Sequence, residues 1–114
     1  MLSVEALNNF GAKTQEGLAR CLGQEEFYLR LVKSALDSED FDKLSAALAE
    51  DDLDTAFEKA HALKGVLGNL AFTPMFEVAQ EMTELLRTRT KTDYTEYNEK
   101  LNAMRQELRS LYAE

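Results

Sequence analysis

The feature that most constrains the fold is the spacing of apolar residues in the last quarter of the chain. Apolar side chains recur there at alternating intervals of three and four residues, which places them on one face of an α-helix. The stripe consists of Tyr94, Tyr97, Leu101, Met104, Leu108 and Leu111. This pattern predicts a helix over about residues 93–112 that buries one face against other helices.

Similar spacing, bounded by capping residues, predicts further helices upstream. The expected segments are residues 3–10, 14–23, 24–36, 38–48, 51–70 and 73–86, with a loop at 87–93. Asp51 or Asp52 fits an N-cap, while Thr73 and Pro74 fit an N-cap and the first helical position. Short loops between long amphipathic helices imply antiparallel neighbours. We therefore expect an all-α fold, an antiparallel up-and-down four-helix bundle with short N-terminal helices, in a single domain over residues 1–114.

Composition excludes several classes of protein. The chain is 45% hydrophobic and 30% charged, which allows a real core and argues against disorder. One Cys and one His leave no internal disulfide framework and no Cys/His zinc site. A net charge of −8 argues against nucleic acid as a partner. We see neither a membrane-spanning apolar run nor a signal peptide, and we expect a cytoplasmic protein without membrane partners.

The negative charge is concentrated in one part of the chain. Residues 37–58 contain nine acidic residues and one basic residue, which accounts for the whole net charge. The simplest interpretation is a solvated helix face with acidic N-caps. A field that steers a partner, or a cation site, is the alternative. The acidic residues lack the spacing and the central glycine of an EF-hand calcium loop.

The single histidine, His61, lies off the core face of its predicted helix. On a helical wheel the core residues Leu53, Ala56, Ala60, Leu63, Leu67 and Leu70 share one arc. His61 lies about 120° from the centre of that arc, on an accessible flank. A lone histidine there is ordinarily a surface or hydrogen-bonded structural residue, so its neighbours decide the interpretation.

Those neighbours are Lys64, Gly65 and Gly68, at i+3, i+4 and i+7 from His61. A glycine inside a helix costs about 1 kcal/mol relative to alanine, and nothing in the apolar pattern requires either one. The two glycines either allow a neighbouring helix to pack closely or keep the space around the imidazole open for another protein. Lys64 would bind phosphate as a point charge beside His61.

The segment AHALKGVLGNL at residues 60–70 resembles the histidine-containing phosphotransfer (HPt) domains of multistep two-component signalling. Residues 18–26 look like the turn before the family's first long helix, and residues 44–53 like the approach to its histidine helix. The resemblance covers roughly residues 14–112. It implies a four-helix bundle with short N-terminal extras, in agreement with the helices expected from spacing alone.

The resemblance also implies roles for individual residues. His61 matches the histidine whose Nε2 receives a phosphoryl group from an aspartyl phosphate. Lys64 matches the lysine that contacts the phosphate, Gly65 the glycine that opens the approach, and Gly68 a small position one turn on. We also expect Phe57, one turn before His61, to lie in the partner's docking surface.

The chain departs from the family's pattern at several positions. Val66 stands where many members have a small polar residue, and Ala71 where many have glycine. Some members orient the imidazole with a glutamine from the following helix. The same spacing here gives Thr83, with Gln80 one turn earlier.

The expected function is that of a phosphorelay intermediate. It would accept a phosphoryl group on His61 from a receiver-domain aspartate and pass it to another receiver domain. No nucleotide-binding motif is present, so we expect no kinase activity of its own. We expect no cofactor or metal site either, because the partner receiver domain supplies the magnesium ion. The expected partners of this monomer are response-regulator receiver domains and a hybrid sensor histidine kinase. The alternative is a helical module that only docks on receiver domains without phosphotransfer.

Overall fold

The fold is described by a computed structural model that covers residues 2–113, without the side chains of residues 112 and 113. Seven helices and no strands form within these residues, so the prediction of an all-α fold is confirmed. In chain order the helices are α1 (Val4–Phe10), α2 (Thr14–Arg20), α3 (Glu25–Leu36), α4 (Asp40–Ala49), α5 (Leu53–Asn69), α6 (Thr73–Arg87) and α7 (Thr95–Ala113). None of the described helices is long and apolar enough to cross a membrane.

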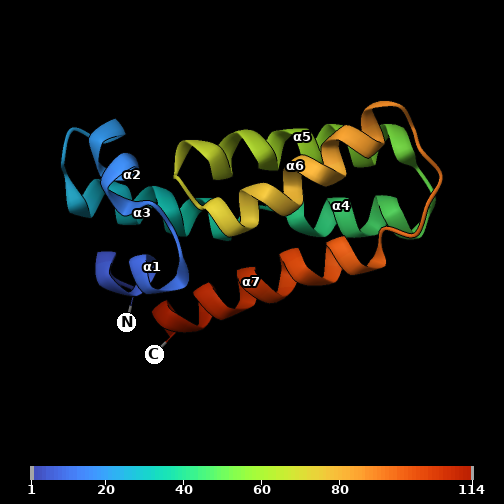
Figure 1. Cartoon of the computed structure of the whole chain (residues 1–114). Coiled ribbons are helices and arrows are strands. Elements are labelled where there is room, and N and C mark those ends of the chain that lie inside the picture. The colour runs from blue at the N-terminus through green and yellow to red at the C-terminus, as the bar shows by residue number, and fades with distance from the viewer. Residues whose placement is uncertain (1, 114) are drawn as a thin grey trace.

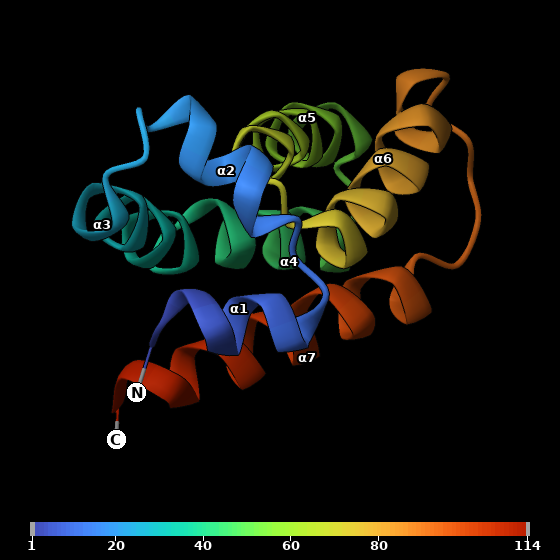
Figure 2. The same ribbon diagram turned by 60° about the vertical axis from the view of Figure 1, so that its left-hand side comes forward.

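The helices form an up-and-down bundle. The chain runs along α3 and α4 in one direction, back along α5, forward along α6 and back along α7 (Figure 1). Helix α5 packs against both α4 and α6. The two short N-terminal helices lie at one end of the bundle, with α1 beside the C-terminal part of α7 (Figures 1 and 2). This arrangement leaves the outer face of α5 without a covering helix.

The apolar stripes of the helices meet in one core. Within α5, Ala56, Ala60, Leu63 and Leu67 are buried and Leu53 is half-buried, so the predicted core face is confirmed. The largest fully buried side chains come from every described helix except α2, and from the turn between α5 and α6. They include Leu7, Tyr28, Leu36, Phe41, Leu67, Phe72, Met75, Met82, Leu86, Leu101 and Leu108.

Side chains cap the first turns of α1 and α5. Ser3 accepts a hydrogen bond from the backbone N–H of Ala6, and Asp52 accepts one from that of Thr55. The predicted N-cap of α6 is wrong by one residue. Thr73 is the first helical residue and Phe72 the N-cap, because the Phe72 carbonyl already accepts the Phe76 N–H at 2.8 Å.

A buried arginine from α7 holds the junction between α3 and α4. Arg105 donates from Nε to the Leu36 carbonyl at 2.7 Å and from Nη2 to the Ser38 carbonyl at 3.2 Å. Its guanidinium also lies 4.5 Å from the centre of the Phe41 ring, and it pairs with Asp42 at 3.4 Å. The arginine thereby satisfies carbonyls that the end of α3 leaves without helical partners.

Candidate functional site

The candidate site lies on the outer face of α5, around His61. The core face of α5 points into the bundle, so the His61 side chain is left exposed to solvent. Its ring lies 5.6 Å from that of Phe57, centre to centre, one helical turn earlier. An exposed imidazole on a regular helix is accessible to a second protein and, when neutral, has a nucleophilic nitrogen.

The two glycines of the motif have different surroundings. A Cβ atom added to Gly65 would meet no atom within 4 Å, whereas one added to Gly68 would lie 3.1 Å from the Phe76 ring. Gly65 therefore leaves open space beside His61, as the sequence predicts. For Gly68 the geometry supports the other alternative, in which the glycine allows a neighbouring helix to pack closely.

Lys64 is half-buried between α5 and α6. Its Nζ lies 3.8 Å from the Glu84 carboxylate, which also lies 3.4 Å from Nη2 of Arg87. The spacing of three residues places Lys64 on the same side of α5 as His61. The sequence therefore identified the cation beside the imidazole, but not the carboxylate from α6 that pairs with it.

Phe57 is half-buried, and two arginines cover its ring. The Arg87 and Arg89 guanidinium carbons lie 5.3 and 4.8 Å from the ring centre, within the range of cation–π contacts. Arg89 is held in turn by Asp54, with 2.6 Å between Nε and the carboxylate. The role of Phe57 in docking stays a prediction, and any partner that contacts this flank meets the guanidinium groups as well.

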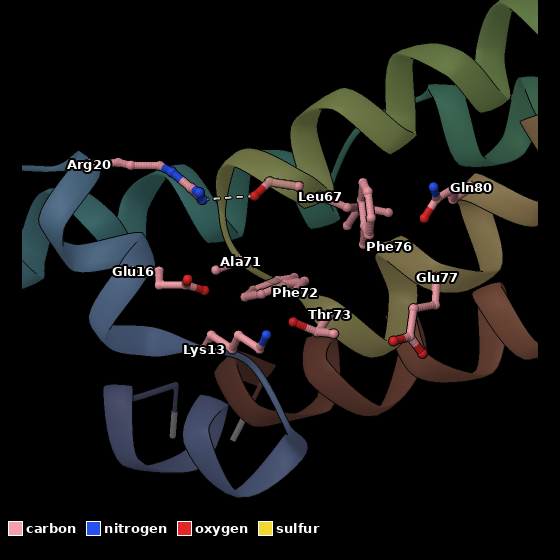
Figure 3. A pocket seen from close by; sticks show the side chains of 11 residues that line it. Lys13, Glu16, Arg20, Leu67, Ala71, Phe72, Thr73, Phe76, Glu77 and Gln80 are labelled. Atoms are coloured by element: carbon pink, nitrogen blue, oxygen red, sulfur yellow. Dashed lines mark hydrogen bonds between the residues drawn. The ribbon is translucent and has the colours of Figure 1, made fainter.

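Residues from α2 and α3 hold the C-terminal turn of α5. Arg20 donates to the Gly68 and Asn69 carbonyls at 2.9 and 3.0 Å, and its side chain reaches from α2 to this turn (Figure 3). The Tyr28 hydroxyl donates to the Leu70 carbonyl at 2.9 Å. Burial, and to a lesser extent the Cys21 thiol, raise the pKa of Tyr28 to about 12, so this hydroxyl stays a donor. Both contacts satisfy carbonyls at a helix end.

An open depression of about 320 Å³ lies along α5 between His61 and the end of the helix. Its lining consists of Arg20, His61, Lys64, Gly65, Gly68, Asn69 and Phe76. Phe76 extends from α6 toward α5 and also lines a second depression, which carries Glu77 and Gln80 (Figure 3). The structure thus brings together His61, Lys64 and both glycines, and adds Arg20, which the sequence analysis did not identify as part of the site.

Neither of the two candidates for orienting the imidazole does so. Thr83 is fully buried, and its hydroxyl donates to the Ala79 carbonyl at 2.7 Å. Gln80 is exposed on α6, where it lines a different depression together with Phe76 and Glu77. The His61 ring instead contacts the ring of Phe57.

The described part of the chain offers no group of three or more His, Cys, Asp or Glu side chains arranged to hold a metal ion. The site instead combines an exposed imidazole, an ammonium group one turn away and open space beside Gly65. Such a set of groups can accept an anionic group on nitrogen and partly neutralise its charge.

Comparison with known proteins supports one family. The family model described as Hpt domain matches residues 30–111, from the middle of α3 to the last turn of α7. This match covers well over half of the chain and leaves α1 and α2 outside it. Comparisons with curated proteins and with solved structures found no match.

Proposed function

The chain belongs to the Hpt domain family, whose members take part in histidine phosphotransfer in phosphorelays, and from this premise we propose that His61 carries the phosphoryl group here. The observation that carries the proposal is the position of His61. It is the one histidine of the 114 residues, and it is exposed on α5 with Lys64 and Gly65 one turn away.

The proposed reaction is a phosphoryl transfer between two side chains. The Nε2 lone pair of neutral His61 attacks the phosphorus of an aspartyl phosphate on a receiver domain. A P–N bond forms as the P–O bond breaks, and the aspartate leaves as a carboxylate. The Nδ1 proton stays on the ring and then exchanges with water. The reverse steps deliver the group to the aspartate of a second receiver domain.

The residues next to His61 support this chemistry. A phosphoryl group brings between one and two negative charges near neutral pH, and the Lys64 ammonium can offset part of that charge. The space above Gly65, free of atoms within 4 Å of an added Cβ, would admit the partner's phosphorylated loop. We assign the aspartyl phosphate and the magnesium ion to the receiver domain, and we expect a hybrid sensor histidine kinase upstream.

An apolar groove next to the site would accommodate the receiver domain. Leu31 and Val66 are 38% and 42% exposed, although both are large apolar residues. They line the α3–α5 groove, an open depression that also includes Ala35, Leu70 and Asn69. Asn69 also lines the depression around His61, so the two depressions border each other at this residue. We assign this groove to the receiver domain, because it exposes large apolar side chains and borders the depression around His61.

The first experiment tests the site and the function together. The protein is incubated with a panel of phosphorylated receiver domains, and transferred label is measured for the wild type and for His61→Gln. We expect label on the wild type alone, labile in acid and stable in base. Label on His61→Gln would show that another residue accepts the group. Binding of a receiver domain without any transfer would support the docking-only alternative.

A second experiment tests the groove. Val66→Glu places a charge in the α3–α5 groove, and we expect it to raise the receiver concentration needed for half-maximal transfer. Ala103→Glu adds the same charge at an exposed position of α7 and serves as the control. Equal half-saturation for both variants would remove the groove from the docking surface.

A further inference from the structure

Glu84 on α6 forms ion pairs with two cations near His61. Its carboxylate lies 3.8 Å from Lys64 Nζ and 3.4 Å from Arg87 Nη2. Arg87 in turn covers the ring of Phe57, which contacts the imidazole. The carboxylate thus competes for the same ammonium group that a phosphoryl group on His61 would need.

The Lys64–Glu84 pair is weak enough to be exchanged. The Lys64 side chain is 25% exposed and the Glu84 side chain 55%, so water screens their attraction. Exposed ion pairs of this kind contribute little to stability. A phosphoryl group one turn away carries more negative charge than a carboxylate and offers three acceptor oxygens. Lys64 would therefore exchange Glu84 for the phosphoryl group when His61 is loaded.

We propose that Glu84 is a positioning residue that competes with the phosphoryl group for Lys64 and so limits how much phosphohistidine accumulates. This inference rests on the proposed phosphorylation of His61. In free protein Glu84 holds the ammonium toward α6, and in loaded protein it opposes the new contact. When the P–N bond breaks and the group leaves for a receiver aspartate, the Lys64–Glu84 pair re-forms. The competition therefore favours transfer of the phosphoryl group to a receiver domain over its retention on His61.

The test compares Glu84→Gln with wild type at equilibrium with one phosphorylated receiver domain. Gln keeps the shape of the side chain and removes its charge, so we expect the equilibrium constant for loading His61 to rise by about two- to five-fold. Glu96→Gln is the matched control. It removes the same charge from another exposed ion pair, with Lys100 at 3.1 Å on α7. An equal rise of the loading constant in both variants would show that only the net charge of the protein matters, and would overturn the proposal.

A double-mutant cycle separates positioning from simple repulsion. Lys64→Ala alone should lower loading several-fold, because the phosphoryl group loses its nearest ammonium. In the Lys64→Ala background, Glu84→Gln should have a clearly smaller effect than in wild type, since the competition no longer exists. An undiminished effect would mean that Glu84 acts only through its charge, and the proposed competition would be wrong.

A chemical donor separates failure of this inference from failure of the proposed function. Phosphoramidate is used to load His61 without any receiver domain, and the phosphohistidine is observed by 31P NMR. We expect Glu84→Gln to raise the loaded fraction and shift the 31P signal, because the ammonium moves closer to the phosphoryl group. These changes together with no receiver-dependent transfer would contradict the proposed function alone. Transfer that proceeds while Glu84→Gln matches wild type with both donors would contradict this inference alone.

Discussion

At the scale of the residue, Gly65 and Gly68 lie three positions apart on α5 and have different neighbours. The space beside Gly65 is open, whereas Gly68 faces the ring of Phe76. A side chain at the first position would project toward the partner, and one at the second would push on α6. Two glycines with the same helix propensity therefore have separable effects on transfer and on stability.

Substitution at each glycine should separate these effects. Gly65→Gln should keep or raise the free energy of unfolding, by up to about 1 kcal/mol, because glutamine has the better helix propensity. It should also lower transfer by occupying the approach to His61. Gly68→Gln should lower the free energy of unfolding by about 1–3 kcal/mol, since Phe76 must move. Denaturant unfolding and the transfer assay give both quantities. Unfolding of Gly65→Gln would show that Gly65 is a packing residue.

At the scale of the element, the N-terminal end of α5 depends on a charged cap. Hydrogen bonds from the Thr55 side chain and backbone hold the pKa of Asp52 below its ordinary value of 3.8. A carboxyl group with a lowered pKa in the folded state stabilises the fold above its unfolded pKa. That contribution is lost as the pH falls through the pKa of Asp52 in the folded protein. We therefore expect part of the stability that the protein loses at low pH to come from the first turn of α5.

Replacing the cap by asparagine tests this contribution. Asp52→Asn should unfold at nearly the wild-type denaturant concentration at pH 7, because asparagine is an equally good N-cap. As the pH falls from about 5 to about 3, through the pKa of aspartate in the unfolded chain, the variant should lose less stability than wild type. Urea unfolding at several pH values gives the comparison. Identical pH profiles for the two proteins would contradict the role assigned to the charge.

The turn between α2 and α3 contains an unfavourable backbone conformation. Leu22 has a φ of 56° and is 86% exposed, so a large apolar side chain lies in the left-handed region without burial to offset the strain. Leu22→Asn should raise the free energy of unfolding by about 0.5–1 kcal/mol, because asparagine adopts this conformation more readily. The shift of the urea midpoint measures the effect. A lower midpoint would show that Leu22 makes stabilising contacts.

At the scale of the whole molecule, Arg105 joins α7 to the junction of α3 and α4. Only 8% of its side chain is exposed, and it donates to two carbonyls from that junction. Hydrogen bonds to a buried charged donor contribute more than neutral ones. This contact holds α7 against α3 and α4.

Removing that contact should weaken the bundle as a unit. Arg105→Met keeps an apolar stem but leaves the Leu36 and Ser38 carbonyls without this donor, and we expect a loss of about 2 kcal/mol in unfolding free energy. Arg109→Met, one turn later, is the control, because Arg109 pairs with Asp37 at 3.5 Å with 39% exposure. Its loss should stay below about 1 kcal/mol. Equal losses in the two variants would show that Arg105 has no special structural role.

Local physics determined which helices form and where most of them end. Asp52 caps α5 as predicted, and Ser3 caps α1 in the same way, since capping needs only a short polar side chain near the first free N–H groups. Helical spacing also separated the buried face of α5 from the face that carries His61. The apolar stripes, in turn, predicted a bundle, because each must be covered by another helix.

Contacts between helices required the tertiary structure. Glu84 and Arg87 reach Lys64 and Phe57 only because α6 packs against α5 in one register, and no spacing along the chain encodes that register. The same register buried Thr83 and turned Gly68 into a packing position. Arg20 and Arg105 likewise bind carbonyls that lie 48 and 69 residues away along the chain. The sequence by itself thus determined the helices and the histidine face, because these depend on neighbours within one or two turns. Only the packed bundle decided which charges surround the histidine, because those charges come from different helices.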